Sequence, residues 1–171
     1  MNTNSNQVLY GENSFEKRKT TKQIPTKRID IVSLRLVRES SITYPTRKIR
    51  FAEDAAELFR PLLENSDREK FICMNLGTKH EPTSIIICSV GTLDATIVHP
   101  RDVLKSACIS NASGIIVAHN HPSGDPTPSN EDIAVTKRLN DACNILGIDF
   151  LDHLVIGSNG RFESIRQRGW V

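Results

Sequence analysis

The chain has 171 residues, of which 38% are hydrophobic and 25% are charged, a balance that is typical of a single globular domain with a substantial core. No apolar run approaches the roughly 20 residues that a membrane-spanning helix requires, and the polar residues 1–6 lack the apolar region of a secretory signal. We therefore expect neither a membrane protein nor a secreted one, and we predict a cytoplasmic location.

The net charge of +2 is unevenly distributed along the chain. Residues 1–28 hold six basic and two acidic side chains, which gives this end a charge of +4 and leaves the rest of the chain at −2. Residues 1–27 are rich in Asn, Thr, Lys and Gln and show no sustained hydrophobic periodicity, so we predict a disordered basic arm over 1–27 and a folded domain over 28–171. Such an arm is either simply solvated or makes weak contacts with nucleic acid.

In chain order, the first predicted element is a strand over about 29–36, where polar and apolar side chains partly alternate. An amphipathic helix follows over about 50–64. Two short apolar runs, 71–74 and 84–88, predict neighbouring strands joined by a turn, and residues 93–98 predict a further strand. In the helix predicted over 50–64, the apolar face is formed by Phe51, Ala55, Phe59 and Leu62.

Pro100 opens a second predicted helix, and residues 114–118 form a continuous apolar run that is typical of a strand buried on both faces. A loop rich in turn residues leads into a third helix over about 130–146, which Gly147 caps, and then into a strand over 148–156. The apolar face of this third helix is formed by Val135, Leu139, Ala142 and Leu146. Because strands and helices interleave, the sequence predicts an α/β fold in which helices pack on the faces of a mixed sheet.

Four cysteines are widely separated in the chain, and apolar residues flank each of them. They are Cys73, Cys88, Cys108 and Cys143. Because no two of them form a C-x-x-C pair, the sequence indicates neither a thiolate zinc site nor a redox motif. We expect four buried free thiols.

The residues that indicate chemistry follow the buried strand over 114–118. His119 and His121 are two positions apart, and in an extended chain this spacing directs both imidazoles to one side. Asp132 falls in the first turn of the next predicted helix and can return as an oxygen ligand. Two imidazoles and a carboxylate suit zinc, and three protein ligands leave its fourth tetrahedral position to water, which is the arrangement of a catalytic site.

Each of these residues also has an ordinary structural explanation. A single histidine is usually a satisfied core or surface residue, although the paired spacing of His119 and His121 fits that explanation poorly. Ser129 and Asp132 match a helix N-cap with an acidic residue at the third helical position. The two roles are compatible, because a cap that fixes the start of the helix also places Asp132 near the metal.

The spacing His119-x-His121, seven residues, Ser129, two residues and Asp132 reproduces the H-x-H-x7-S-x2-D signature of the JAMM (MPN+) metalloproteases. More closely, the chain resembles the JAB domain of bacterial RadC proteins over roughly 28–171. This resemblance implies the JAMM fold, a curved mixed β-sheet flanked by helices in three layers (α-β-α). It also implies a zinc-dependent metallopeptidase or isopeptidase-like hydrolase.

The similarity to RadC proteins is most specific between residues 91 and 157. Matching stretches lie at 90–93, 98–103, 118–125, 151–157 and 168–170. Longer RadC proteins also carry an N-terminal helical module that resembles helix-hairpin-helix DNA binders. In this chain only the short basic arm stands at that place, which weakens a DNA-binding interpretation.

The resemblance also implies a general acid/base, because JAMM enzymes carry a glutamate at the start of the strand that follows the first helix. Glu69 matches this position, Asp67 and Glu81 are the alternatives, and an exposed charge at a strand entry is the structural explanation. In the implied mechanism, zinc-activated water attacks an amide carbonyl and Glu69 moves the proton. The Ser129 hydroxyl donates a hydrogen bond to the developing oxyanion.

Two functions remain open on the sequence. The first is a zinc-dependent hydrolase acting on a peptide or protein amide, which the sequence does not identify further. The second is a nucleic-acid-associated protein, of the DNA-repair kind with which RadC proteins have been labelled, that keeps a structural metal site and docks through its basic arm. Asp152 and His153 either orient the metal ligands or form a structural pair at a strand end.

Overall fold

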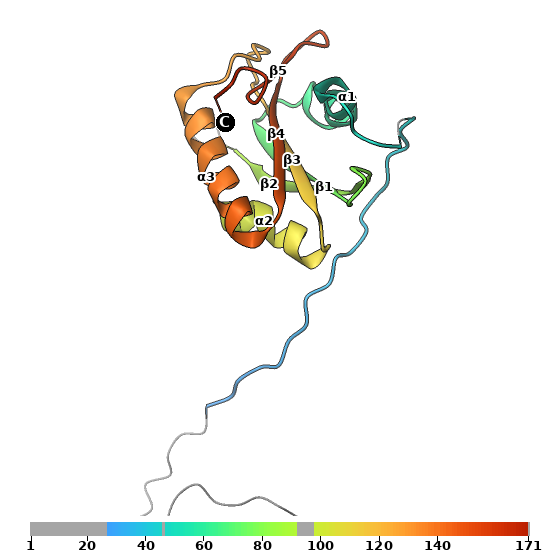
Figure 1. Cartoon of the computed structure of the whole chain (residues 1–171), viewed down its shortest axis with the longest axis vertical. Coiled ribbons are helices and arrows are strands. Elements are labelled where there is room, and N and C mark those ends of the chain that lie inside the picture. The colour runs from blue at the N-terminus through green and yellow to red at the C-terminus, as the bar shows by residue number, and fades with distance from the viewer. Residues whose placement is uncertain (1–26, 46, 92–97, 171) are drawn as a thin grey trace, which may run out of the picture. The chain divides into compact units, whose positions relative to one another are not determined.

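The computed structural model of the chain describes residues 27–45, 47–91 and 98–170. The chain divides into two units, Met1–Ser33 and Leu34–Val171, and every helix and strand of the described residues belongs to the second unit (Figure 1). In chain order these elements are α1 (Ala52–Leu63), β1 (Lys70–Leu76), β2 (Pro82–Val90), α2 (Pro100–Ile109), β3 (Gly114–Asn120), α3 (Asn130–Leu146), β4 (Asp149–Ile156) and β5 (Phe162–Ser164).

The strands form one mixed sheet in the order β2-β1-β3-β4-β5. β1 pairs antiparallel with both β2 and β3, whereas β3 pairs parallel with β4, and β5 runs antiparallel to β4. A parallel pair needs a crossover connection, and α3 supplies it between β3 and β4. The predicted α/β fold with a mixed sheet is therefore confirmed, as is the buried central strand, because all seven residues of β3 are buried.

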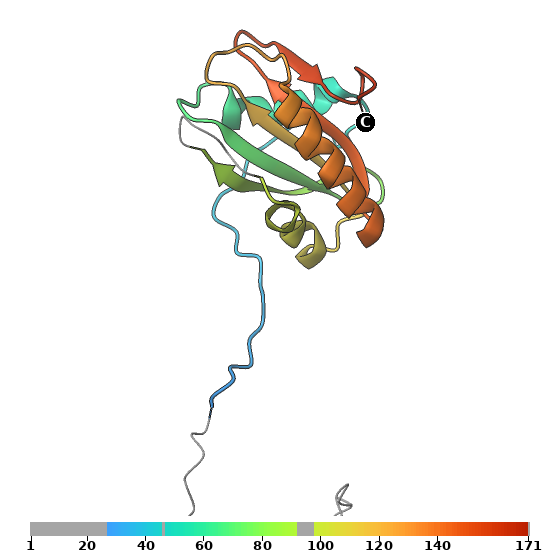
Figure 2. The same cartoon turned by 90° about the vertical axis from the view of Figure 1, so that its left-hand side faces the viewer.

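Helices cover both faces of this sheet, as Figure 2 shows. On one face α1 packs against the strands, with Phe59 in the same core cluster as Ile72 of β1. On the other face α2 and α3 pack, with Leu139 of α3 in the same cluster as Cys73 of β1. Successive side chains of a strand point to opposite faces, so β1 contributes to both clusters, and the predicted three-layer α-β-α arrangement is confirmed.

The predicted helices agree closely with the observed ones. α3 begins directly after its N-cap Ser129 and ends at Gly147, which adopts a left-handed backbone with φ +67°, because glycine takes this conformation at little cost. Two apolar faces are less complete than predicted. Phe51 precedes α1 and is exposed, and Leu146 is half exposed at the end of α3, since the terminal turn of a helix extends beyond the layer it covers.

One predicted strand is not formed, and one observed strand was not predicted. The strand predicted over 29–36 is wrong, because residues 27–44 form neither helix nor strand, and alternation alone does not make a strand without a partner to accept its hydrogen bonds. β5 was not predicted, since its three residues are too few to show a period. The strand predicted over 93–98 lies, except for its last residue, outside the described residues and stays a prediction.

The expectation of four buried thiols is correct for Cys73 and Cys143 only. Cys88 is half-buried, and Cys108 near the end of α2 is exposed. The buried face of α2 instead comprises Val103, Leu104, Ser106 and Ala107. All four thiols are free among the residues that the structure describes.

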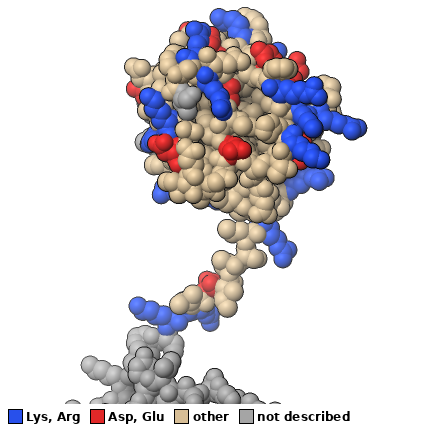
Figure 3. Space-filling model, in the orientation of Figure 1, with Lys and Arg blue, Asp and Glu red and all other residues tan. Residues whose placement is uncertain are grey.

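Two further properties of the described residues bear on function. Within the described ranges, no helix combines the length and the apolar character that crossing a bilayer requires. On the face drawn in Figure 3, basic and acidic side chains are interspersed with uncharged ones, in keeping with a composition of 22 basic and 20 acidic residues.

Candidate metal centre

The candidate metal centre lies at the C-terminal end of β3, the middle strand of the sheet. His119 is the sixth residue of β3 and is fully buried, because β1 and β4 pair with the strand on its two sides. His121 follows the strand directly and is half-buried. As the period of two predicts, the imidazoles lie together, with their Nε2 atoms 3.0 Å apart.

A tight turn then reverses the chain toward α3. The Gly124 N–H donates to the carbonyl oxygen of His121 (2.8 Å), and Gly124 adopts a φ of +77°. A Cβ at this position would lie 2.5 Å from Ser158 Oγ, so the turn also fits closely against the loop after β4. The Gly and Pro residues that the sequence places here thus return the chain to the strand end.

The N-terminus of α3 is fixed by a reciprocal cap. Ser129 Oγ accepts from the backbone N–H of Asp132 (3.1 Å), while Asp132 Oδ2 accepts from both the backbone N–H and the hydroxyl of Ser129 (2.7 Å each). The carboxylate is thereby held in one orientation at the first turn of the helix. The predicted capping role of Ser129 is therefore present, and its hydroxyl proton is directed at Asp132.

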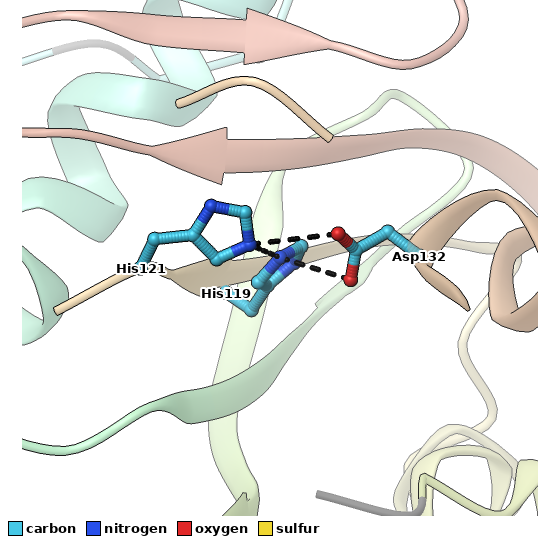
Figure 4. Close-up of side chains that lie close together, drawn as sticks. All are labelled: His119, His121 and Asp132. Atoms are coloured by element: carbon cyan, nitrogen blue, oxygen red, sulfur yellow. Dashed lines mark hydrogen bonds and ion pairs between the residues drawn. The ribbon is translucent and has the colours of Figure 1, made fainter. Parts of the chain in front are cut away.

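The structure brings His119, His121 and Asp132 together, as Figure 4 shows. His119 Nε2 lies 3.2 Å from Asp132 Oδ1, and His121 Nε2 lies 3.5 Å from Asp132 Oδ2. In a tetrahedral zinc site with bonds of about 2.0–2.1 Å, neighbouring ligand atoms are about 3.3–3.4 Å apart. Each imidazole nitrogen lies at about this distance from one of the two carboxylate oxygens, and one ligand atom from each residue lies within 4.8 Å of the others. The three residues could therefore hold a metal ion, while their role as ligands remains a prediction.

The half-buried His121 is oriented by the turn that follows it. Its Nδ1 lies 2.9 Å from the carbonyl oxygen of Asp125, which can only accept, so Nδ1 carries a hydrogen. In the neutral imidazole, Nε2 then presents a lone pair toward Asp132. This is the tautomer that binds a metal through Nε2.

Electrostatics at the centre favour a bound cation. Burial opposes ionisation of Asp132, but the imidazoles of His119 and His121, which lie 3.2 and 3.5 Å from its oxygens, outweigh burial and hold the pKa of this carboxyl well below its usual range. When His121 is protonated, its Nε2 donates to Asp132, which raises the pKa of His121, and the charge of Glu69 adds to that shift. The centre therefore holds a carboxylate at neutral pH, next to imidazoles that a proton or a metal ion can bind.

A second pair of polar side chains lies behind His119. His119 Nδ1 is 2.8 Å from Nε2 of His153 on β4, and His153 Nδ1 is 2.6 Å from the hydroxyl oxygen of Thr136 on α3. That hydroxyl also donates to the backbone carbonyl of Asp132 (2.6 Å). The ring of Phe71 is stacked with His119 and meets His153 edge-on, at centroid distances of 6.1 and 5.2 Å.

Among the three predicted general bases, Glu69 contributes to the raised pKa of His121, and its role as the base remains a prediction. It precedes β1, whose Phe71 pairs with His119, and its charge influences His121. Glu81 lies beyond the other end of β1, where its carboxylate accepts from the backbone N–H of Lys79 (2.9 Å). About five residues of strand, roughly 17 Å, separate the two ends, which excludes Glu81. Asp67 is exposed.

Asn120 fixes the backbone around Glu69, a role that was not predicted. Its Oδ1 accepts from the N–H of Lys70 (2.9 Å), and its Nδ2 donates to the carbonyl of Arg68 (3.1 Å). The residue between the two histidines thus holds the segment on both sides of the glutamate. The side chain is 2% exposed, so it is a specific clamp rather than a surface contact.

Asp152 and His153 take different roles, as the two explanations given by the sequence allowed. The His153 ring contacts His119, whereas the buried Asp152 carboxylate accepts from Ser164 Oγ (2.7 Å) and from the backbone N–H groups of His153 (2.7 Å) and Arg166 (3.3 Å). Burial raises the pKa of Asp152, and its hydrogen bonds reduce that shift. Asp152 therefore anchors the C-terminal segment and is structural.

Thr136 is a further residue of the centre that was not predicted. It lies one helical turn after Asp132, on the side of α3 that carries the buried Leu139 and Cys143. A polar residue on this otherwise apolar face was the signal that could have identified it.

Comparison with known proteins identifies the family of the chain. A family model described as RadC-like JAB domain matches residues 49–170. A UPF0758 protein of Methanosarcina mazei is 44% identical over 133 residues, which is 78% of this chain and 58% of the relative. UPF0758 proteins of Desulforamulus reducens and Moorella thermoacetica are 46% and 47% identical, over 72% and 77% of this chain and 54% and 57% of the relatives. The chain thus spans little more than half the length of these curated relatives.

Proposed function

Because the chain belongs to the family of RadC-like JAB domains, we propose that it is a zinc-dependent hydrolase of amide bonds, either a metallopeptidase or an isopeptidase-like enzyme. In this proposal His119, His121 and Asp132 hold one zinc ion. The observation that carries it is the convergence of three ligand atoms within 4.8 Å of one another, on side chains that hydrogen bonds already orient.

The donor set supports zinc over other metals. Two imidazole nitrogens and one carboxylate oxygen are characteristic of catalytic zinc sites, whereas calcium and magnesium prefer a larger set of oxygens. The half-buried positions of His121 and Asp132 leave the open side of the centre accessible to a substrate.

When bound, zinc supplies Lewis acidity, since it polarises a carbonyl and lowers the pKa of water from about 16 toward 7. Glu69 acts as the general base that takes a proton from the attacking water and returns it to the leaving nitrogen. Asn120 holds the backbone around this glutamate. For Ser129 to serve as an oxyanion donor, its proton must leave the Asp132 carboxylate that now accepts it.

Metal analysis of the purified chain tests the first half of this proposal. We expect about one zinc ion per chain, and near-complete loss in a His119→Ala, His121→Ala double variant, because one remaining carboxylate is a poor site. Stoichiometric zinc in the double variant would contradict the assigned centre.

A peptide-library cleavage screen tests the second half. Cleavage should stop on treatment with a chelator and return with zinc, and Glu69→Gln should keep zinc while turnover falls by roughly 10² to 10⁴. Glu81→Gln is the matched control and should leave turnover unchanged. If the chain binds zinc but cleaves no peptide or protein amide, it is a metal-binding protein and not a hydrolase.

A further inference from the structure

The hydrogen bond from Thr136 to Asp132 sets the direction of the hydrogen bonds behind His119. The hydroxyl of Thr136 lies 2.6 Å from the carbonyl oxygen of Asp132, which has no hydrogen, so the single hydroxyl proton lies between these two oxygens. Thr136 Oγ1 is then left as an acceptor toward His153 Nδ1, also at 2.6 Å. His153 therefore carries its hydrogen on Nδ1.

The direction continues to the metal centre. A neutral imidazole has one N–H, so His153 Nε2 presents a lone pair, and the 2.8 Å contact requires His119 Nδ1 to donate to it. His119 Nε2 is consequently the acceptor nitrogen, and it faces Asp132 at 3.2 Å. Both imidazole donors point away from the centre, and the Thr136 hydroxyl donates to the backbone carbonyl of Asp132.

We propose that His153 and Thr136 are positioning residues that hold His119 in the tautomer whose Nε2 can bind a metal ion. This inference rests on the proposed function only in taking His119 as a metal ligand. The two residues also link the ligands mechanically. Thr136 donates to the backbone carbonyl of Asp132 on α3, and His153 accepts from His119 on β3. Because Thr136 and His153 also contact each other, these bonds connect the start of α3 to the end of β3.

An ordinary buried histidine with satisfied hydrogen bonds is the competing explanation, and the two explanations predict different results when the acceptor is removed. Without the Thr136 hydroxyl, the Nδ1 hydrogen of His153 has no partner in its fully buried position, and the tautomer with hydrogen on Nε2 becomes favourable. That hydrogen would point at His119 Nδ1. His119 would then carry its own hydrogen on Nε2, where a metal could not bind.

A pair of variants at Thr136 tests this directly. Thr136→Val has nearly the same shape but no hydroxyl, and we expect its zinc affinity, measured by competition with a chromophoric chelator, to fall by about 10- to 100-fold. Thr136→Ser keeps the hydroxyl and should stay within about threefold of the original chain. Equal affinities for the two variants would overturn the proposal.

The tautomer itself is measurable by nitrogen NMR of metal-free, histidine-labelled protein. We expect the hydrogen of His119 on Nδ1 in the original chain and on Nε2 in Thr136→Val. This readout needs neither zinc nor hydrolysis, so it tests the inference even if the chain proves to bind no zinc or to cleave no amide. A His119 hydrogen on Nε2 in the original chain would refute the inference.

A second pair of variants, at His153, tests the proposal if the Thr136 variants fail to fold. Gln can place an acceptor oxygen near the position of Nε2, whereas Leu offers none, so zinc affinity should fall more in His153→Leu than in His153→Gln. Asn75→Ala removes buried hydrogen bonds to Ser84 and Ser106 on the part of β1 away from His119, and it serves as the control for lost stability. If it weakens zinc binding as much as His153→Leu does, the effect is one of stability and the positioning role is wrong.

Discussion

At the scale of single residues, a substitution of Asn120 distinguishes the proposed metal binding from the proposed catalysis. We expect Asn120→Ala to retain zinc but to lose at least tenfold in turnover, because the backbone on both sides of Glu69 is released. Asn75→Ala is the matched control. It removes another fully buried asparagine, which bonds to Ser84 and Ser106, and should lower the melting temperature without reducing turnover. Equal turnover in both variants would show that Asn120 is only structural.

Ser129 combines a cap with a predicted catalytic contact, and one substitution separates them. Ser129→Ala should cost about 1 kcal/mol of stability, because α3 loses its N-cap. If the hydroxyl also stabilises an oxyanion, turnover should fall by roughly 10²-fold while zinc is retained. Thermal unfolding and steady-state kinetics of the same preparation measure both effects. A lower melting temperature with unchanged turnover would assign Ser129 to the cap alone.

The pH dependence of zinc binding follows from His121. Asp132 raises the pKa of this imidazole in the metal-free centre, so a proton competes with zinc at a higher pH than at an ordinary histidine, whose pKa is about 6.5. Zinc affinity should be constant at alkaline pH and should have fallen to about half at a pH above 6.5. Chelator competition at a series of pH values measures this. A loss of half the affinity only at or below that ordinary value would contradict the raised pKa.

At the scale of elements, the N-terminal end of α3 carries Asp132, whereas its C-terminal end only stops the helix. Two glycines with left-handed backbones, one near each end, allow the two ends to be tested separately. Gly124 lies in the turn that leads to the ligand-bearing end of α3, and Gly147 ends the helix. Gly147→Ala should cost about 1 kcal/mol of stability and leave zinc affinity unchanged, since no atom lies within 4 Å of the added Cβ.

Gly124→Ala should lower zinc affinity as well as stability. Its Cβ would meet Ser158 Oγ at 2.5 Å, and its backbone has a φ of +77°, so the turn that connects His121 to α3 has to shift. Chelator competition and thermal unfolding of both glycine variants make the comparison. Identical zinc affinities in the two variants would show that the turn does not position the ligands.

Elements were predictable where local signals agree with one another. α3 carries a capping serine at one end and a glycine at the other, and β3 is apolar throughout its first five residues, so both were located from the sequence. Residues 29–36 show partial alternation but have no partner strand among the described residues. β5 depends wholly on its pairing with β4. Pairing partners are a tertiary property that local patterns do not contain.

The same distinction applies to the candidate site. The spacing of His119, His121 and Asp132 indicated a metal centre, because all three lie within one strand–turn–helix segment. Thr136 and Asn120 escaped notice, since their roles depend on β4 and on the chain before β1. Glu81 could be excluded only when the direction of β1 placed it at the far end of the strand.

At the scale of the whole molecule, the reactivity of the thiols measures how well the packing of the helices on the sheet excludes solvent. Cys108 is exposed, Cys73 and Cys143 are buried, and burial raises the pKa of both Cys88 and Cys143 to about 12. A thiol reagent should therefore modify Cys108 first, and should reach Cys73 and Cys143 only in unfolding conditions, because the thiolate is the reactive form. Peptide mass spectrometry over time identifies the order. Rapid modification of Cys73 in the native protein would contradict the packing of β1.

The short sequence separation of the three candidate metal ligands has a consequence for the order in which the proposed site forms. The segment 119–132 closes on itself over 14 residues, a small loop whose closure costs little entropy, whereas Asn120 reaches Lys70 across 50 residues. During synthesis β1 leaves the ribosome before β3, so it cannot pair with β3 until the later strand has been made. Under the proposed function, we therefore expect a partly folded chain to bind zinc before Glu69 is in place, and hydrolysis to begin only after β1 has paired with β3.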